Sequence, residues 1–388
     1  MPGIYLHIPF CEKKCIYCDF YSITNKSNID QFINALKNEI LLFLKANPEI
    51  DRKIETIYFG GGTPSLLEPK HIAEVVEIIY NNFDLSSLCE FTIECNPGTD
   101  FIRKLPEYKS IGINRISIGV QSLNESELKF LGRIHTSNEA TRSIESALDF
   151  FENVSVDIIF SIPNQTEKSL LNTLKYLLEF DLKHISAYSL IYEEGTPLFN
   201  QLQKGKVFPK NENEDYELYR TIQSFLLNRG FEQYEVSNYA KQGFKSLHNL
   251  GYWQHKEYYG FGPSAHSFYQ SKRVWNVRNL KQYLAFLQNH HLPIEGSEIL
   301  DEEKKMLEKI MLGLRSEGIC LQKFKEDFDV DIQSELNEVL QEWIALGFAK
   351  IENGFLKLTP NGYFVCDKLT VDLTEKVESC IKIKDYQT

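Results

Sequence analysis

The sequence predicts an α/β fold in which a parallel sheet is followed by a smaller helical domain. Over the first two thirds of the chain, short β-rich runs alternate with segments that have the apolar periodicity of helices. Parallel neighbours in a sheet need crossover connections, and the intervening helices provide them. The last quarter instead shows helical patterns followed by a hairpin. The predicted strands cover residues 4–8, 54–59, 90–95, 115–120, 154–160 and 184–191.

Amphipathic helices are predicted between these strands. Apolar residues recur every three or four positions over 29–44 and over 72–79, so each segment has one apolar face. A third helix is predicted over 166–180, where the side chain of Thr166 can cap the first turn. Active sites of such folds lie where the strands end and the following loops begin. Residues at the strand ends are therefore the candidates for a functional site.

The alternation ends near residue 192. An acidic stretch at 211–215 leads into a helix that ends near residue 228, and a strand is predicted over 231–236. An aromatic segment punctuated by glycine follows over 248–268. Helices followed by a hairpin with the turn Glu352-Asn353-Gly354 are typical of a winged-helix-like domain. The predicted helices of this domain cover 301–314, 320–327 and 332–346, and the hairpin covers 348–358.

Composition and charge limit the classes of partner. Lys and Arg number 42 against 54 Asp and Glu, a net charge of −12, and no basic run is long enough to follow a phosphate backbone. We therefore expect no nucleic-acid partner. No apolar stretch reaches the roughly 18 residues of a membrane span, and the N-terminus lacks the features of a signal peptide, so a cytoplasmic protein is expected. A peripheral membrane contact and a homodimer are compatible with the sequence.

Three cysteines crowd into eight positions directly after the first predicted strand. Cys11, Cys15 and Cys18 can curl around one polynuclear centre, whereas the other five cysteines are scattered. The alternative is a structural zinc site with His7 as its fourth ligand. Zinc sites typically pair ligands from two knuckles, and no second such pair is present. The spacing therefore favours a cluster of four irons that leaves one iron open.

Other chemistry-bearing residues follow the next strands. The glycine-rich run Gly60-Gly61-Gly62-Thr63-Pro64 follows the second strand and lets the main chain approach a ligand, although alone it is also compatible with a plain turn. Glu94 closes the third strand, and Gln121 follows the fourth. Asp157 lies among apolar residues of the fifth strand, where a carboxylate is costly unless it is paired. These positions predict a ligand site at one edge of the sheet.

The cysteine loop after the first strand and the glycine-rich loop after the second strand together resemble those of the radical S-adenosylmethionine (SAM) superfamily. The runs Tyr5-Leu6-His7-Ile8-Pro9-Phe10-Cys11 and Cys18-Asp19-Phe20 narrow the resemblance to the oxygen-independent coproporphyrinogen III oxidase-like family, most closely to its heme chaperone branch, HemW. The resemblance implies an incomplete (β/α)6 radical SAM barrel with a C-terminal helical, winged-helix-like domain. It divides the chain into a partial barrel over 1–240, an aromatic linking segment over 241–295 and the C-terminal domain over 296–388.

The resemblance also implies cofactors and site residues. Cys11, Cys15 and Cys18 would ligate a [4Fe-4S] cluster whose open iron is chelated by SAM. Tyr5 and Tyr17 would contact SAM beside the cluster. The backbone of Gly61, Gly62 and Thr63 would face the methionyl group. Further SAM positions are Glu94, Gln121, Arg133, Asp157, Ile191 and His266.

The run His248-Asn249-Leu250-Gly251-Tyr252-Trp253 resembles the H-N-x-x-Y-W segment that distinguishes the heme chaperones. The resemblance implies that His248 ligates heme iron and that Tyr252 and Trp253 form part of the surrounding wall. An imidazole is a standard axial ligand of heme, and aromatic rings can stack on a macrocycle. The alternative from the residues alone is a packed turn whose His makes an ordinary hydrogen bond.

The implied function is a heme chaperone that binds a [4Fe-4S] cluster, SAM and heme and transfers heme to an acceptor protein. The alternative is an oxygen-independent coproporphyrinogen III oxidase. Two departures from the oxidase pattern argue against it: Phe20 stands where the oxidase has a further Cys, and only four residues precede Tyr5. A third class, an RNA-modifying radical enzyme, conflicts with the acidic charge.

Overall fold

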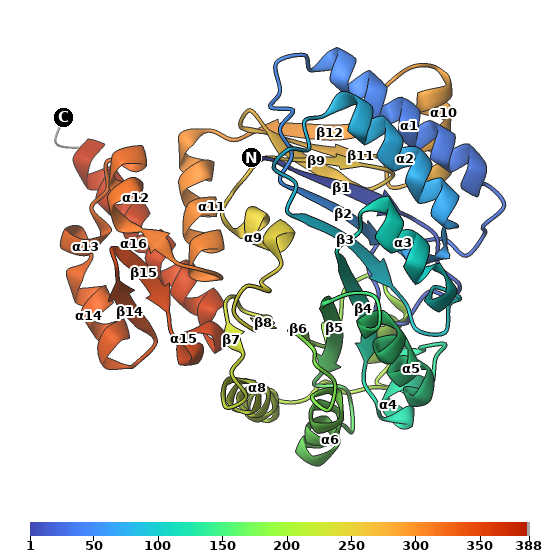
Figure 1. The fold of residues 1–388 in the computed structure, drawn as a ribbon. Coiled ribbons are helices and arrows are strands. Elements are labelled where there is room, and N and C mark those ends of the chain that lie inside the picture. The colour runs from blue at the N-terminus through green and yellow to red at the C-terminus, as the bar shows by residue number, and fades with distance from the viewer. Residues whose placement is uncertain (386–388) are drawn as a thin grey trace.

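The computed structural model describes residues 1–385 and contains a large curved sheet with a separate C-terminal domain beside it (Figure 1). Twelve strands of the described chain form the sheet in the order β12-β11-β10-β9-β1-β2-β3-β4-β5-β6-β8-β7. Strands β1 to β6 are parallel and adjacent in chain order, which confirms the predicted fold class. These strands are Gly3–Ile8, Thr56–Gly61, Glu90–Cys95, Arg115–Gln121, Asn153–Phe160 and His184–Ser189.

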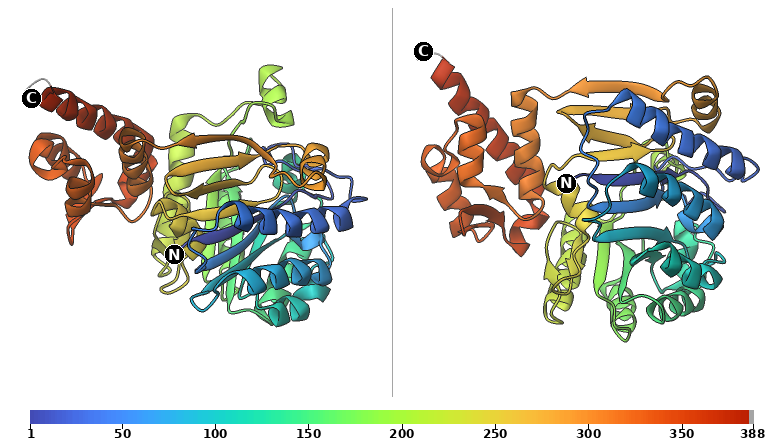
Figure 2. Two further views of the ribbon diagram at one scale, coloured as in Figure 1. Left: turned by 90° about the horizontal axis from the view of Figure 1, so that it is seen from above. Right: turned by 45° about the horizontal axis from the view of Figure 1, so that its top comes forward.

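Helices cover the outer face of this parallel sheet (Figure 2). The predicted third helix is α6, and its first turn is capped as expected, because the hydroxyl of Thr166 accepts a hydrogen bond from the backbone N–H of Ser169 at 3.1 Å. The helices and short 3-10 turns up to residue 227 are α1 (Ile29–Ala46), η1 (Pro64–Leu66), α2 (Pro69–Asn82), η2 (Ile102–Lys104), α3 (Leu105–Ile111), α4 (Glu125–Leu131), α5 (Ser137–Leu148), α6 (Glu167–Leu177), α7 (Pro197–Gln203) and α8 (Glu212–Leu227).

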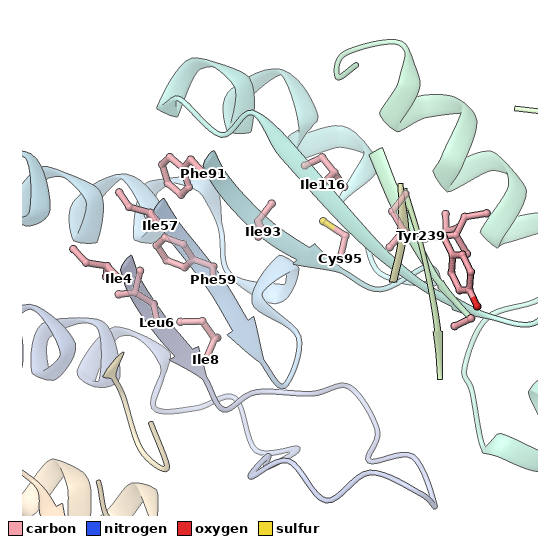
Figure 3. Packing of buried hydrophobic residues seen from close by; sticks show 14 of the residues in the cluster. Ile4, Leu6, Ile8, Ile57, Phe59, Phe91, Ile93, Cys95, Ile116 and Tyr239 are labelled. Atoms are coloured by element: carbon pink, nitrogen blue, oxygen red, sulfur yellow. The ribbon is translucent and has the colours of Figure 1, made fainter. Parts of the chain in front are cut away.

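Side chains alternate between two unlike faces of the sheet. The apolar set faces the helices and joins residues of α1 and α2, such as Phe32 and Ile72, in one core. Figure 3 shows this set from neighbouring strands: Ile4, Leu6, Ile8, Ile57, Phe59, Phe91, Ile93, Cys95 and Ile116. The residues between them are polar and line the concave face: Tyr5, His7, Tyr58, Glu90, Glu94, Arg115, Ser117, Ser155, Asp157 and His184. The concave face is therefore built for hydrophilic contacts.

The polar face is closed at one end by helix α9 (Leu247–Trp253). Glu90 of β3 caps this helix: its Oε2 accepts a hydrogen bond from the backbone N–H of Leu247 at 2.6 Å, and its Oε1 accepts one from that of His248 at 3.3 Å. Arg115 of β4 is 2% exposed and lies in the same interior, where Glu90 supplies opposite charge. The helix is thus anchored by a buried carboxylate at its positive end.

Residues 241–295, predicted as an aromatic linking segment, contain α9 and strands that extend the sheet. Strand β9 (Tyr258–Phe261) pairs in parallel with β1, so Gly3 lies between Thr56 of β2 and Tyr258. Three antiparallel strands continue from β9: β10 (His266–Tyr269), β11 (Lys272–Asn276) and β12 (Ile294–Ile299), with α10 (Leu280–Gln288) before the last. At the opposite edge, the predicted strand 231–236 is reduced to β7 (Glu232–Gln233), followed by β8 (Asn238–Ala240).

The C-terminal domain has the predicted order of helices followed by a hairpin. The turn residues Asn353 and Gly354 both have positive φ, 52° and 79°, as a two-residue hairpin turn requires. The predicted helix 332–346 is broken at Leu336 into α13 and α14. The elements are α11 (Glu302–Leu314), β13 (Ile319–Cys320), α12 (Leu321–Phe328), α13 (Ile332–Glu335), α14 (Asn337–Ala345), β14 (Ala349–Glu352), β15 (Phe355–Leu358), α15 (Pro360–Phe364) and α16 (Cys366–Asp385). None of the helices described in the structure is both long and apolar enough to cross a bilayer.

Candidate cluster and cofactor site

The three clustered cysteines lie on the loop between β1 and α1, at the carboxyl end of the parallel strands. Cys11 is buried, and the hydroxyl of Thr63 lies 3.5 Å from its Sγ. Gly62 approaches the same thiol so closely that a Cβ there would stand 3.1 Å from Sγ and 2.7 Å from the carbonyl oxygen of Phe10. The glycine-rich loop after β2 and the cysteine loop after β1 therefore form one site, and position 62 excludes a side chain.

Arg133, which follows α4, ties the cysteine loop to the strand ends. Its Nη1 donates to Cys15 Sγ at 3.5 Å, and its Nη2 donates to the carbonyl oxygen of Gly119 at 2.7 Å and to the side-chain oxygen of Asn96. Burial raises the pKa of Cys11, and it raises the pKa of Cys18 to about 11. The guanidinium beside Cys15 supplies the positive charge that a thiolate in this loop requires.

The zinc alternative with His7 is not supported by this geometry. His7 is 3% exposed, its Nε2 lies 2.9 Å from the carbonyl oxygen of Tyr21, and its Nδ1 lies 3.2 Å from the hydroxyl of Tyr5. Both ring nitrogens are therefore occupied. Three thiols on one loop fit a larger centre, and a bound [4Fe-4S] cluster would supply an open iron and an electron.

Glu94 stands at the end of β3 beside the glycine-rich loop. Its Oε1 accepts a hydrogen bond from the hydroxyl of Tyr58 at 2.9 Å, and its Oε2 accepts one from the backbone N–H of Gly61 at 3.2 Å. Burial raises the pKa of Glu94 to about 7. A carboxylate held in this way, in a desolvated site, is suited to bind a cationic group of a ligand.

Asp157 and Gln121 occupy the ends of the neighbouring strands. The hydroxyl of Ser117 lies 3.3 Å from each carboxylate oxygen of Asp157, and burial raises the pKa of this carboxyl. Gln121 has a φ of 66°, at a point where the pairing of β4 with β5 is irregular after Gly119. Irregular pairing re-aims a side chain at the end of a strand. Both residues therefore lie on the predicted cofactor side.

The other predicted SAM contacts come from β1, the cysteine loop, the end of β6 and β10. Tyr5 projects from β1 beside His7, and Tyr17 on the cysteine loop lies beside Arg133. Ile191 follows β6 and is 63% exposed, and His266 is the exposed first residue of β10. Direct contacts thus join Cys11 and Glu94 to the glycine-rich loop, and Arg133 to Cys15. Among the described residues, no hydrogen bond joins the side chain of Ile191 or His266 to them.

His248, which the resemblance gives as a ligand of heme iron, is buried in this structure. It lies in α9, 3% exposed, with its Nδ1 2.8 Å from the hydroxyl of Thr56 and its Nε2 2.8 Å from the hydroxyl of Tyr252. Its ring also stacks on Tyr58, with centroids 5.0 Å apart. Both ring nitrogens are hydrogen-bonded inside the protein, so iron could bind His248 only after one of these bonds is broken. Trp253 is half-buried at the end of α9.

Several residues of the site were not singled out from the sequence. Tyr58 and Ser117 hold the two carboxylates, and neither carries a motif of its own. Asn96, which accepts a hydrogen bond from Arg133, stands two residues after Glu94 in the run Glu94-Cys95-Asn96-Pro97. That position at a strand end is the one signal that could have indicated it.

Comparisons with known proteins identify the family and the fold. Residues 5–177 match the radical SAM superfamily, and residues 300–365 match the HemN C-terminal domain. The heme chaperone HemW of Bacillus subtilis is 34% identical over 366 residues, which cover 93% of this chain and 96% of the relative. HemW of Lactococcus lactis is 33% identical over 362 residues, covering 92% and 93%. The solved structure of coproporphyrinogen III oxidase from Escherichia coli, a radical SAM enzyme, has the same fold, with a TM-score of 0.81, 20% identity and coverage of 96% and 90%.

Proposed function

This chain belongs to the HemW heme chaperone family of the radical SAM superfamily, and from that membership we propose that it binds a [4Fe-4S] cluster, SAM and heme and passes heme to an acceptor protein. The observation that carries the proposal is the convergence of three thiols, the glycine-rich loop and Glu94 at the carboxyl ends of β1 to β3.

Each part of the site has a role in this proposal. Cys11, Cys15 and Cys18 hold the cluster. The backbone at Gly61 and Gly62 and the carboxylate of Glu94 bind SAM beside it. Arg133 keeps Cys15 and the strand ends in fixed relation through its contacts with Gly119 and Asn96. These contacts pre-arrange the donors, so that little reorganisation is needed when the cofactors bind.

The partner in this proposal is a heme-acceptor protein, and the place of action is the cytosol. The cysteines described in the structure form no disulfide. A homodimer and a peripheral membrane contact are compatible with the proposal, and light scattering and vesicle flotation test them.

The test is reconstitution followed by transfer. Purified protein is loaded anaerobically with iron and sulfide, titrated with hemin, and then mixed with an apo-hemoprotein. We expect a Soret band in the loaded protein, retention of iron and sulfide, and transfer faster than from hemin-loaded serum albumin. A protein that acquires the cluster but binds no hemin would contradict the proposal.

A further inference from the structure

A cavity of about 450 Å³ lies between the cysteine loop, strands β9 to β11 and helix α11. Asp19 and Phe20 line it from the loop directly after Cys18, and Leu312 lines it from the C-terminal domain. Its volume is within the range of sites for small molecules and cofactors. Tyr5 also lines it, so the cavity shares a wall with the predicted SAM site.

The lining of the cavity is suited to a flat aromatic ligand that carries negative charge. Phe20, which is 66% exposed, stands in the lining together with Tyr252, Tyr258 and Phe268. Such rings stack on a macrocycle. Arg273 and Arg278 add positive charge to this aromatic lining.

Two arginines, Arg273 and Arg278, also line the cavity. Arg273 is held by Glu298 at 3.1 Å and by Glu308 of α11 at 2.9 Å. Arg278 lies 2.9 Å from a carboxylate oxygen of Asp19, and its side chain remains about half exposed. A guanidinium can bind carboxylates bidentately, so the propionates of heme would share or replace the carboxylate partners that both arginines have in this structure.

Three imidazoles line the cavity, His7, His255 and His266, and their ring nitrogens are engaged to different extents. His7 uses both nitrogens, as described above. His255 stacks on Phe268 with centroids 4.4 Å apart, and its Nε2 lies 2.9 Å from Glu308. Among the described residues, the ring of His266 has no hydrogen-bond partner and stacks only on Trp275, at 6.2 Å.

We propose that heme binds in this cavity with its propionates toward Arg273 and Arg278 and with His266 as a ligand of the iron, in place of the SAM contact that the resemblance implies for this residue; this inference rests on the proposed heme-chaperone function. His248 then has a positioning role, because its hydrogen bond fixes Tyr252 in the cavity wall. The H-N-x-x-Y-W segment supports heme binding through that wall.

The experiment is hemin titration of the cluster-loaded, full-length protein, followed by absorbance of the Soret band. We expect His266→Ala to weaken hemin binding at least tenfold and to shift the Soret band, with iron and sulfide unchanged, and millimolar imidazole to restore the original spectrum. His266→Cys should give the spectrum of a thiolate-ligated heme. His291→Ala, at an exposed histidine outside the cavity lining, is the matched control and should behave as the wild type.

The outcomes separate the two proposals. If the wild type binds no hemin, the proposed function fails. If the wild type binds hemin, while His266→Ala and His266→Cys keep its affinity and spectrum, the assignment of His266 fails and heme binds elsewhere. The esterified probe, hemin dimethyl ester, should bind the wild type more weakly than hemin; equal binding would overturn the role of the arginines.

Discussion

The Nε2 atom of His248 lies 2.8 Å from the hydroxyl oxygen of Tyr252, one helical turn further along α9. This pair joins a residue buried in the sheet interior to a residue in the cavity wall. Because Thr56 occupies the other ring nitrogen, the imidazole acts as a bridge between β2 and the helix. The most distinctive histidine of the sequence is therefore a structural connector in this arrangement.

Removal of this connector should destabilise the fold. His248→Ala leaves the hydroxyls of Thr56 and Tyr252 without their partner in a buried setting, and we expect a loss of about 2–4 kcal/mol in the free energy of unfolding. Urea denaturation measures it. His291→Ala, at an exposed site, should change stability by less than about 0.5 kcal/mol. Equal stabilities of the two variants would show that the buried hydrogen bonds contribute nothing.

Each cysteine of the cluster loop should be essential for cluster assembly. Replacing Cys11, Cys15 or Cys18 by Ala leaves only two thiols on the loop, and we expect loss of the oxygen-sensitive cluster. Iron and acid-labile sulfide after reconstitution are the measurement. Cys89→Ala, at an exposed cysteine outside the loop, is the control and should retain both. Bound zinc without sulfide in the wild type would contradict the cluster.

Glu94 should bind SAM in its ionised form. A charge-assisted hydrogen bond contributes about 1.5–3 kcal/mol, so Glu94→Gln should weaken SAM binding roughly 10- to 100-fold without loss of iron or sulfide. Because burial raises the pKa of Glu94 to about 7, wild-type SAM affinity should fall below pH 7, and the variant should lack this dependence. Calorimetric titration measures both. Glu107→Gln, on the exposed side of α3, is the control.

Glu39 of α1 should make stability depend on pH. It accepts hydrogen bonds from the backbone N–H of Gly262 at 2.8 Å and from the hydroxyl of Tyr283 at 2.6 Å, and burial raises its pKa from 4.5 to about 7. The folded state therefore binds more protons than the unfolded state between these values. Glu39 therefore contributes about 3 kcal/mol to the free energy of unfolding below pH 4.5, and this contribution is lost as the pH rises through 7.

Unfolding free energies of the wild type and of Glu39→Gln, measured from pH 4.5 to 8, test this dependence. The variant should lack the decline contributed by Glu39, whatever its absolute stability. An unchanged slope would assign the pH dependence to other groups.

The protein should not convert coproporphyrinogen III to protoporphyrinogen IX. Phe20 occupies the position of a further cysteine in the oxidase pattern, and its ring is largely exposed beside the cavity. Anaerobic incubation with SAM, a reductant and the porphyrinogen, followed by chromatography, is the measurement. Sustained formation of the decarboxylated product would favour the oxidase instead.

The parallel strands and the cysteine loop were predictable because each carries a strong local signal. The strands beyond residue 257 were not, because β9 to β11 are short and rich in aromatic residues, and only their pairing with β1 identifies them. The site shows the same division. Glu94 was predictable because a carboxylate at a strand end is a sequence signal. Tyr58 and Ser117, which contact the two carboxylates, have no such signal in the sequence. The burial of His248 depends on Glu90, which is distant in sequence, so a motif alone could not reveal it.

The two unlike faces of the sheet also govern how its strands can align during folding. A one-residue slip of β5 against β4 would turn Asp157 toward the helices and Val156 toward the polar interior. The same slip in β3 would bury Glu90 and Glu94 in the apolar layer, where neither has a partner. Wrong alignments therefore carry buried, unpaired charge. The carboxylates of the cofactor site therefore also disfavour misaligned strand pairings during folding, before any cofactor has bound.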